Sequence, residues 1–320
     1  MSVTRFGLQI PSFTYPGVGE RELFSRVADI AGAADESGFD SVWVMDHFYQ
    51  IHMVGPPADP MFEAYTLLGA IAARTSKVSV GAMVTGVTYR NPALLAKQVT
   101  TLDVISAGRA ILGIGAAWNE EEHAGYGFEF PPIGERMDRL EEALQICRAM
   151  FTEDAPSFSG RHYTISHALN VPRPVRPQGI PILVGGGGER RTLALVVKHA
   201  DACNLFGDLA TVRHKLDVLE RHCEAVGRDP VTITKTRLGG LVIAETAELA
   251  ERKGAEMARA RGMDPERYRG YVVAGDPDSV CEQLGAYFDA GLDGLIFNMH
   301  DAQDLEPVRL AGETLSRAFG

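Results

Sequence analysis

The sequence predicts an α/β protein folded as a single (β/α)8 barrel, the TIM-barrel arrangement, and three observations lead to this prediction. Short apolar segments alternate with segments whose apolar residues recur at helical spacing, and eight such pairs can be followed along the 320 residues. The strands are apolar on both faces, as in parallel sheets that helices cover on each side. No shift in composition marks a domain boundary, and eight repeated units suit a closed barrel. A doubly wound open sheet is the alternative arrangement.

The predicted strands are short, mainly apolar runs, and the helices between them show apolar residues three and four positions apart. The strands are expected at residues 6–11, 41–45, 78–84, 110–114, 181–184, 202–206, 233–244 and 294–298. The first helix carries Leu23, Val27 and Ile30 on one face and ends at Gly38, a residue that favours helix C-termini. Asn91 precedes a proline at the first position of another helix. The other helices are expected at about residues 60–74, 137–151, 193–200, 212–223 and 280–288.

Three longer stretches interrupt this alternation. The last of them is rich in Ala, Arg and Glu and lies between the seventh and eighth predicted strands. We therefore expect one domain over residues 1–320, with insertions at about residues 116–133, 153–180 and 245–273.

The formal net charge of −11 argues against nucleic-acid binding, because a phosphate backbone attracts basic surfaces. No apolar run approaches the roughly 20 residues that span a membrane, and the N-terminal residues lack the apolar core of a signal peptide. The cysteines are far apart in sequence and lie in apolar patterns, so we expect reduced, buried thiols. They are Cys147, Cys203, Cys223 and Cys281. Together these features predict a cytoplasmic protein.

A run of glycines stands between the fifth predicted strand and the helix that follows it. The run consists of Gly185, Gly186, Gly187 and Gly188. A turn without side chains lets a ligand approach the main chain, and the N–H groups and dipole of a helix start favour an anion. A tight turn without a ligand would need fewer glycines, so we favour a phosphate or a similar anion. Arg190 and Arg191 oppose the dipole and are easier to understand beside an anion, although they could face solvent or pair with Glu189.

Functional groups of such barrels gather at the C-terminal ends of the strands. Asp46 and His47 follow the second predicted strand, and an imidazole there could transfer a proton near neutral pH. Alternatively, Asp46 caps the next helix and His47 fills a hydrogen-bonded gap. Ala116 and Ala117 follow the fourth strand, and their small side chains leave room for a flat ligand or for tight helix packing. Asn119 beside them offers donors and acceptors.

The acidic run at residues 120–123 resembles a set of metal ligands. It consists of Glu120, Glu121, Glu122 and His123. Adjacent side chains on a helix point in different directions, so they do not converge on one ion. We expect a solvated helix start instead, since carboxylates favour the positive end of the dipole. The other histidines show no metal-ligand spacing, so no metal is predicted.

The order of these segments resembles the bacterial luciferase-like flavin barrels, and among them the oxidoreductases that use the deazaflavin coenzyme F420. The likeness covers nearly the whole chain and is strongest at residues 38–47, 90–96, 106–122, 181–191 and 291–294. It implies a flat three-ring cofactor across the strand ends, with its phosphate at the glycine run. It also implies that Asp46 and His47 line the ring, with His47 as proton donor. Met83 and Val84 match the position at which relatives carry a non-prolyl cis peptide bond against the ring.

The resemblance thus assigns roles to particular residues of this chain. The catalytic candidates are His47 and Asp46. The cofactor-binding candidates are Met83, Val84, Thr85, Ala116, Ala117, Asn119, the four glycines and Glu189. The candidates for the substrate side are Phe13, Phe48, Tyr49 and Phe206. One departure concerns a glutamate that some deazaflavin-dependent relatives carry after the small residues, because Trp118 takes its place here. The residues that mark sugar-phosphate specificity are also not recognisable.

The expected function is hydride transfer between F420 and an organic substrate. The alternatives are a two-component monooxygenase that uses reduced FMN, and a flavin- or deazaflavin-binding carrier without turnover. A flavin-free barrel that binds a phosphorylated metabolite is a further alternative, but no Lys or carboxylate pair stands at a strand end as its base. The resemblance also implies a homodimer and a separate reductase or dehydrogenase that recycles the cofactor.

Overall fold

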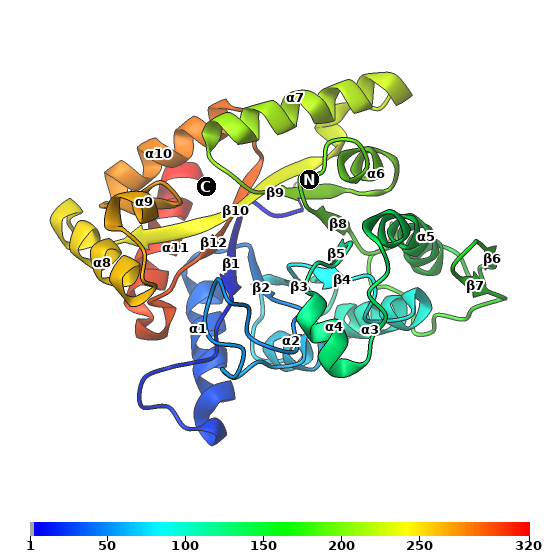
Figure 1. Ribbon diagram of the computed structural model, residues 1–320, viewed down its shortest axis with the longest axis horizontal. Coiled ribbons are helices and arrows are strands. Elements are labelled where there is room, and N and C mark those ends of the chain that lie inside the picture. Colours follow the sequence, from blue (N-terminus) through cyan, green and yellow to red (C-terminus); the bar gives the residue numbers. More distant parts are fainter. Residues whose placement is uncertain (1–2) are drawn as a thin grey trace.

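The computed structural model describes residues 3–320 and contains a closed barrel of parallel strands (Figure 1). The hydrogen-bonded order around the barrel is β1 (Phe6–Ile10), β2 (Ser41–Val44), β3 (Ser79–Ala82), β5 (Ala110–Gly115), β8 (Ile182–Gly185), β9 (Ala202–Leu205), β10 (Thr234–Ile243) and β12 (Gly294–Asn298). The barrel closes because β12 pairs with β1. Each predicted strand overlaps one of these, so the predicted (β/α)8 barrel is confirmed and the open sheet is wrong.

Helices surround the barrel and cover the outer faces of its strands. They are α1 (Leu23–Ser37), α2 (Ala64–Ala72), α3 (Pro92–Ile105), α5 (Ile133–Thr152), α6 (Thr192–His199), α7 (Leu209–Val226), α10 (Pro277–Asp289) and α11 (Glu306–Phe319). α1 ends where Gly38 adopts a left-handed φ of 113°. The side chain of Asn91 accepts the N–H of Ala93 and caps α3. The C-terminal α11, which packs beside α1, is not among the predicted helices.

The core has two layers, as expected for strands that are apolar on both faces. Side chains inside the barrel form one cluster, which includes Trp43, Ile111, Leu183 and Ile296. The opposite faces of the strands pack against the helices in a larger cluster. This arrangement fixes the strand ends, where the candidate site lies.

The three predicted insertions contain elements outside the regular alternation. The first holds α4 (Glu120–Tyr126), and the second holds the antiparallel hairpin of β6 (Phe158–Ser159) and β7 (Thr164–Ile165). The third holds α8 (Ala247–Ala260), α9 (Pro265–Arg269) and β11 (Val272–Gly275). β11 pairs with the last residues of β10, beyond the part of β10 that pairs with β9.

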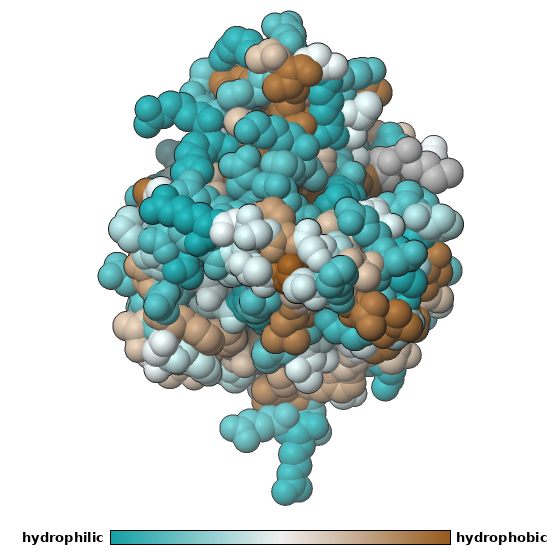
Figure 2. Space-filling model, turned by 90° about the vertical axis from the view of Figure 1, so that its right-hand side faces the viewer, coloured by the Kyte–Doolittle hydropathy of each residue, from teal (hydrophilic) through white to brown (hydrophobic). Residues whose placement is uncertain are grey.

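The cysteines are free, and Cys147, Cys203 and Cys223 are buried as predicted. Cys281 is only half-buried, which corrects the expectation: it follows the buried Val280 on α10, and adjacent side chains of a helix point in different directions. The side of the molecule that carries α5 and the β6–β7 hairpin is mostly hydrophilic, with separate apolar patches (Figure 2). Over residues 3–320, none of the helices combines the length and apolar character that crossing a bilayer requires.

Candidate active site

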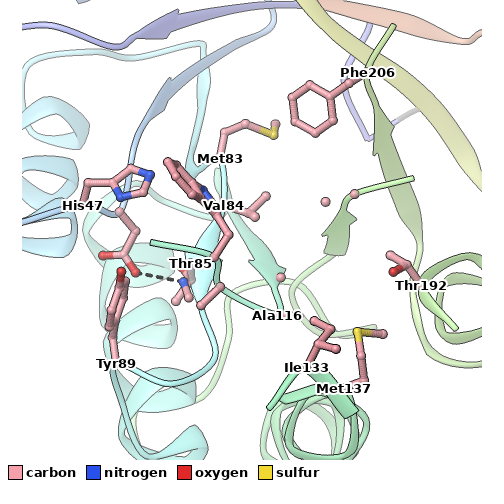
Figure 3. A pocket seen from close by; sticks show the side chains of 17 residues that line it. His47, Met83, Val84, Thr85, Tyr89, Ala116, Ile133, Met137, Thr192 and Phe206 are labelled. Carbon is pink, nitrogen blue, oxygen red and sulfur yellow. Dashed lines mark hydrogen bonds between the residues drawn. The ribbon is translucent and has the colours of Figure 1, made fainter. Parts of the chain in front are cut away.

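A cavity of about 300 Å³ opens at the C-terminal ends of the strands (Figure 3). Most of the predicted site residues line it together: Asp46, His47, Met83, Val84, Thr85, Ala116, Ala117, Gly185, Gly186 and Phe206. Residues that the sequence reasoning did not assign to the site complete the lining, and they include Tyr89, Trp118, Ile133, Met137 and Thr192. Asn119, Gly187, Gly188 and Glu189 lie outside this lining.

The Met83–Val84 segment bulges between β3 and β4 (Thr85–Gly86), and its peptide bond is cis. The side-chain amide of Gln9 donates a hydrogen bond to the Met83 carbonyl at 3.1 Å. The Val84 side chain lies against two glycines of neighbouring strands: a Cβ at Gly115 or Gly185 would come within 2.9 or 2.8 Å of a Val84 methyl group. These two glycines therefore make room for Val84.

Asp46 is buried, and its carboxylate faces a cation. Arg90 donates to both of its oxygens, Nη1 to Oδ2 at 2.7 Å and Nη2 to Oδ1 at 2.9 Å. The N–H of Gly86 donates to Oδ2 at 3.2 Å. Burial alone lowers the pKa of Arg90, but the Asp46 charge outweighs it and raises that pKa. The bond from Gly86 ties the end of β2 to β4, and the bidentate pair ties it to the segment that precedes α3.

His47 lies at the cavity edge, and its Nδ1 is 2.7 Å from Oε2 of Glu122 in α4. Glu122 is fully buried and also accepts the N–H groups of Phe48 and Tyr49, the latter at 3.0 Å. The Tyr89 hydroxyl donates to Oε2 at 3.0 Å. Burial raises the pKa of Glu122, but these donors, led by His47, hold it below its usual value.

The burial of Glu122 corrects the expectation of a solvated acidic helix start. Glu120 and Glu121 are exposed as predicted, but Glu122 and His123 are 0 % exposed. His123 bonds through Nε2 to the Thr88 hydroxyl at 2.7 Å and through Nδ1 to the carbonyl of Asn119 at 2.6 Å. A helix that packs against a protein turns one face inward, so at least one residue of this acidic run could have been expected to be buried. Within residues 3–320, no group of three or more His, Cys, Asp or Glu residues could hold a metal ion.

The glycine run leads from β8 toward α6 across the cavity. Gly186 has a left-handed φ of 118°, and its N–H donates to the carbonyl of Asn204 at 3.1 Å. α6 begins at Thr192, four residues after the run ends. Lys215 of α7 lies against the run, because its Cε would be 3.6 Å from a Cβ at Gly187.

The charged residues that follow the glycines are not among the residues that line the cavity. Glu189 bonds Lys215 Nζ at 2.6 Å and His214 Nε2 at 3.1 Å. Arg191 pairs with Asp138 of α5 at 2.6 Å rather than with Glu189, which corrects that alternative. Arg190 is exposed, as the solvent-facing interpretation predicts. Sequence reasoning missed Lys215 because this cation belongs to the next helix along the chain.

The residues assigned to the substrate side lie in different surroundings. Phe206 is 51 % exposed and lines the cavity beside its mouth. Phe13 is fully buried against Phe62. Phe48 stacks on Tyr126, and the Tyr49 ring lies 5.6 Å from that same tyrosine. Phe206 therefore lines the cavity, whereas Phe13, Phe48 and Tyr49 are not among its lining residues.

Comparisons with known proteins show which proteins this chain resembles in sequence and in fold. The family model described as luciferase-like monooxygenase matches residues 4–294. A Kineococcus radiotolerans protein named F420-dependent glucose-6-phosphate dehydrogenase is 32 % identical over 314 residues, covering 89 % of this chain and 90 % of its own. An F420-dependent secondary alcohol dehydrogenase in complex with an F420-acetone adduct matches with a TM-score of 0.81 and 19 % identity over 99 % of each chain. The oxygenating constituent of 3,6-diketocamphane monooxygenase of Pseudomonas putida, in complex with FMN, has a TM-score of 0.78 and 21 % identity over 99 % and 98 % of the two chains.

Proposed function

Because the chain belongs to the luciferase-like monooxygenase family, we propose that it is an oxidoreductase that transfers a hydride between coenzyme F420 and an organic substrate. One observation carries the proposal: Val84, Ala116, Ala117 and the His47 imidazole face a single open cavity at the strand ends. Its volume of about 300 Å³ lies at the lower end of the range for small-molecule sites. The relative named for F420 supports the choice of cofactor.

The cavity and the glycine run that continues beyond it suit two parts of such a cofactor. Val84, Ala116 and Ala117 offer a shallow apolar bed for a flat ring system. Residues 187–188, the start of α6 and the nearby Lys215 offer N–H groups and positive charge for a phosphate. When bound, F420 supplies the hydride acceptor or donor, and the protein orients it and moves protons.

We assign proton transfer to His47. It is the one histidine among the described residues that line the cavity, and an imidazole exchanges protons readily near neutral pH. Both carboxylate oxygens of Asp46 accept hydrogen bonds, from Arg90 and from the N–H of Gly86. We therefore propose that Asp46 fixes the position of the C-terminal end of β2 and does not exchange protons.

The substrate that best suits the cavity is a neutral one. Trp118, Ile133 and Phe206 are each more than half exposed at its rim and present apolar surface. No Lys or Arg is among the described residues that line the cavity, so the phosphate of a sugar phosphate would meet no cationic side chain there. We therefore do not extend the substrate of the Kineococcus relative to this chain.

An FMN-dependent two-component monooxygenase is the second candidate, because the fold is shared with an FMN-containing monooxygenase. A cytoplasmic homodimer, served by a separate reductase or dehydrogenase that recycles the cofactor, completes the proposal. Exposed apolar side chains on α3 and the segment that follows the β6–β7 hairpin are compatible with a partner chain; they include Leu94, Ile105, Leu169 and Val171.

Equilibrium titration of the purified protein with F420 and with FMN, followed by absorbance and intrinsic fluorescence, separates the two candidates. Trp118 lies at the cavity rim and is expected to report occupancy through quenching of its fluorescence. We expect saturable binding of F420 and at least tenfold weaker binding of FMN, a difference of about 1.4 kcal/mol. Micromolar binding of FMN without binding of F420 would favour the monooxygenase. Binding of neither would point to the flavin-free barrel.

A Gly187→Asp substitution tests whether the glycine run holds the cofactor phosphate. The new carboxylate would repel an anion and compete for Lys215, so we expect at least a tenfold loss of F420 affinity, about 1.4 kcal/mol. Gly19→Asp is the matched control, because Gly19 has open space around it and lies outside the cavity lining. Equal melting temperatures would show that both folds survive. Unchanged affinity in the Gly187 variant would remove the run from the site.

A further inference from the structure

The acidic run in the α4 insertion has a role that the hydride-transfer proposal does not yet use. Its third residue, Glu122, is completely buried although its two predecessors are exposed. The carboxylate receives four hydrogen bonds, from His47, Tyr89 and the main-chain N–H groups of Phe48 and Tyr49. A buried carboxylate with this many donors is held in one place and in its ionised form.

An ionised carboxylate only accepts hydrogen bonds, so it determines which nitrogen of His47 carries the proton. Because Nδ1 lies 2.7 Å from Oε2 of Glu122, the neutral imidazole holds its proton on Nδ1. The other nitrogen, Nε2, is left with a lone pair on the opposite side of the ring. The His47 ring extends toward the cavity that it lines (Figure 3).

Two further contacts hold the ring and its loop. The indole of Trp118 meets the imidazole edge-on, with 5.5 Å between ring centroids. The bonds from the N–H groups of Phe48 and Tyr49 fix the main chain directly after His47 to the same carboxylate. The imidazole side chain is only 13 % exposed as a result.

We propose that Glu122 is a positioning residue that locks His47 in the Nδ1–H tautomer, so that Nε2 exchanges the proton with substrate. This inference rests on the proposed role of His47. In the oxidation of an alcohol, the hydroxyl proton passes to Nε2 while the carbon-bound hydrogen leaves as hydride to oxidised F420, and the alcohol becomes a carbonyl. Glu122 then faces an imidazolium and stabilises its charge. In the reverse reaction the same nitrogen returns the proton.

The test measures the tautomer and the activity separately. Nitrogen-15 NMR of the cofactor-free protein, with labelled histidine and His47 assigned through a His47→Asn variant, reports which ring nitrogen is protonated in the neutral form. In the wild-type protein we expect the proton on Nδ1. In Glu122→Gln, which keeps the shape of the side chain but can also donate, we expect Nε2–H to become populated. The matched control is Glu121→Gln, because this neighbour is exposed and pairs only with the exposed His52 among the described contacts; it should behave as wild type.

With F420 and a substrate that the wild type turns over, Glu122→Gln should lower kcat about 100-fold and leave KM and F420 affinity within threefold. A pure Nε2–H tautomer in the wild type would overturn the proposal, even if Glu122→Gln failed to fold. A folded Glu122→Gln protein with wild-type tautomer and kcat would overturn it as well. Failure of the proposed function is distinct: the wild-type protein would then show the Nδ1–H tautomer but no F420-dependent turnover.

Discussion

A His47→Asn protein is expected to lose between about 10²- and 10⁴-fold in kcat, because general acid–base catalysis by a positioned imidazole contributes about that much. Asparagine places an amide nitrogen close to the position of Nδ1, so the hydrogen bond to Glu122 can persist while the imidazole is gone. Affinity for F420 should therefore change little. Steady-state kinetics and an equilibrium titration of the same preparation check the two parts of this prediction.

His52→Asn is the matched control. This histidine side chain is 74 % exposed and pairs with Glu121, outside the cavity lining. The control should retain wild-type kcat and KM. If His47→Asn kept more than a third of the wild-type kcat, the assignment of proton transfer to His47 would be wrong.

An Arg90→Met substitution is expected to cost about 3–5 kcal/mol of unfolding free energy, because it leaves the buried Asp46 carboxylate without its cation. The Asp46 side chain is 1 % exposed, and that of Arg90 is 8 % exposed. Arg90 also bonds Glu63 at 2.7 Å and lies over the ring of Tyr65, whose hydroxyl bonds that of Thr85 in the cavity lining. Removal of Arg90 therefore also removes contacts beside the cavity. Urea unfolding followed by circular dichroism measures the loss.

Two comparisons show whether the uncompensated charge is the cause. Arg309→Met breaks an exposed pair with Glu306 and should cost no more than about 1 kcal/mol. The double variant Asp46→Asn with Arg90→Met should recover a large part of the stability, since no ion is left buried alone. A loss below about 1 kcal/mol in the single Arg90 variant would show that Asp46 is solvated or otherwise paired.

The fold could be predicted from the sequence because barrel strands are short, apolar on both faces and separated by amphipathic helices. Positions at strand ends follow from that order, and this is why Asp46, His47, Val84, Ala116 and Gly186 could be placed together. The helix α11 was missed although it carries apolar residues at helical spacing.

Side-chain direction and long-range pairing could not be predicted in the same way. Arg90, the partner of Asp46, is 44 residues away in the sequence. Glu122, the partner of His47, lies in an insertion, within an acidic run whose sequence predicts a solvated helix start. Gly185 was interpreted as part of an anion site, but its missing side chain makes room for Val84, which lies in the bulge between β3 and β4. These pairings and the role of Gly185 depend on which helices and strands meet in the folded chain, and the local sequence pattern does not contain that information.

The central claim is hydride transfer with F420, and anaerobic turnover tests it most directly. The protein is mixed with F420 and a series of neutral secondary alcohols, and with reduced F420 and the corresponding ketones and enones, while deazaflavin absorbance and product are followed. We predict that at least one pair reacts in both directions, with one product formed per F420 reduced, and that FMN does not replace F420. Oxygen-dependent product formation with reduced FMN, without any reaction of F420 in either redox state, would contradict the claim.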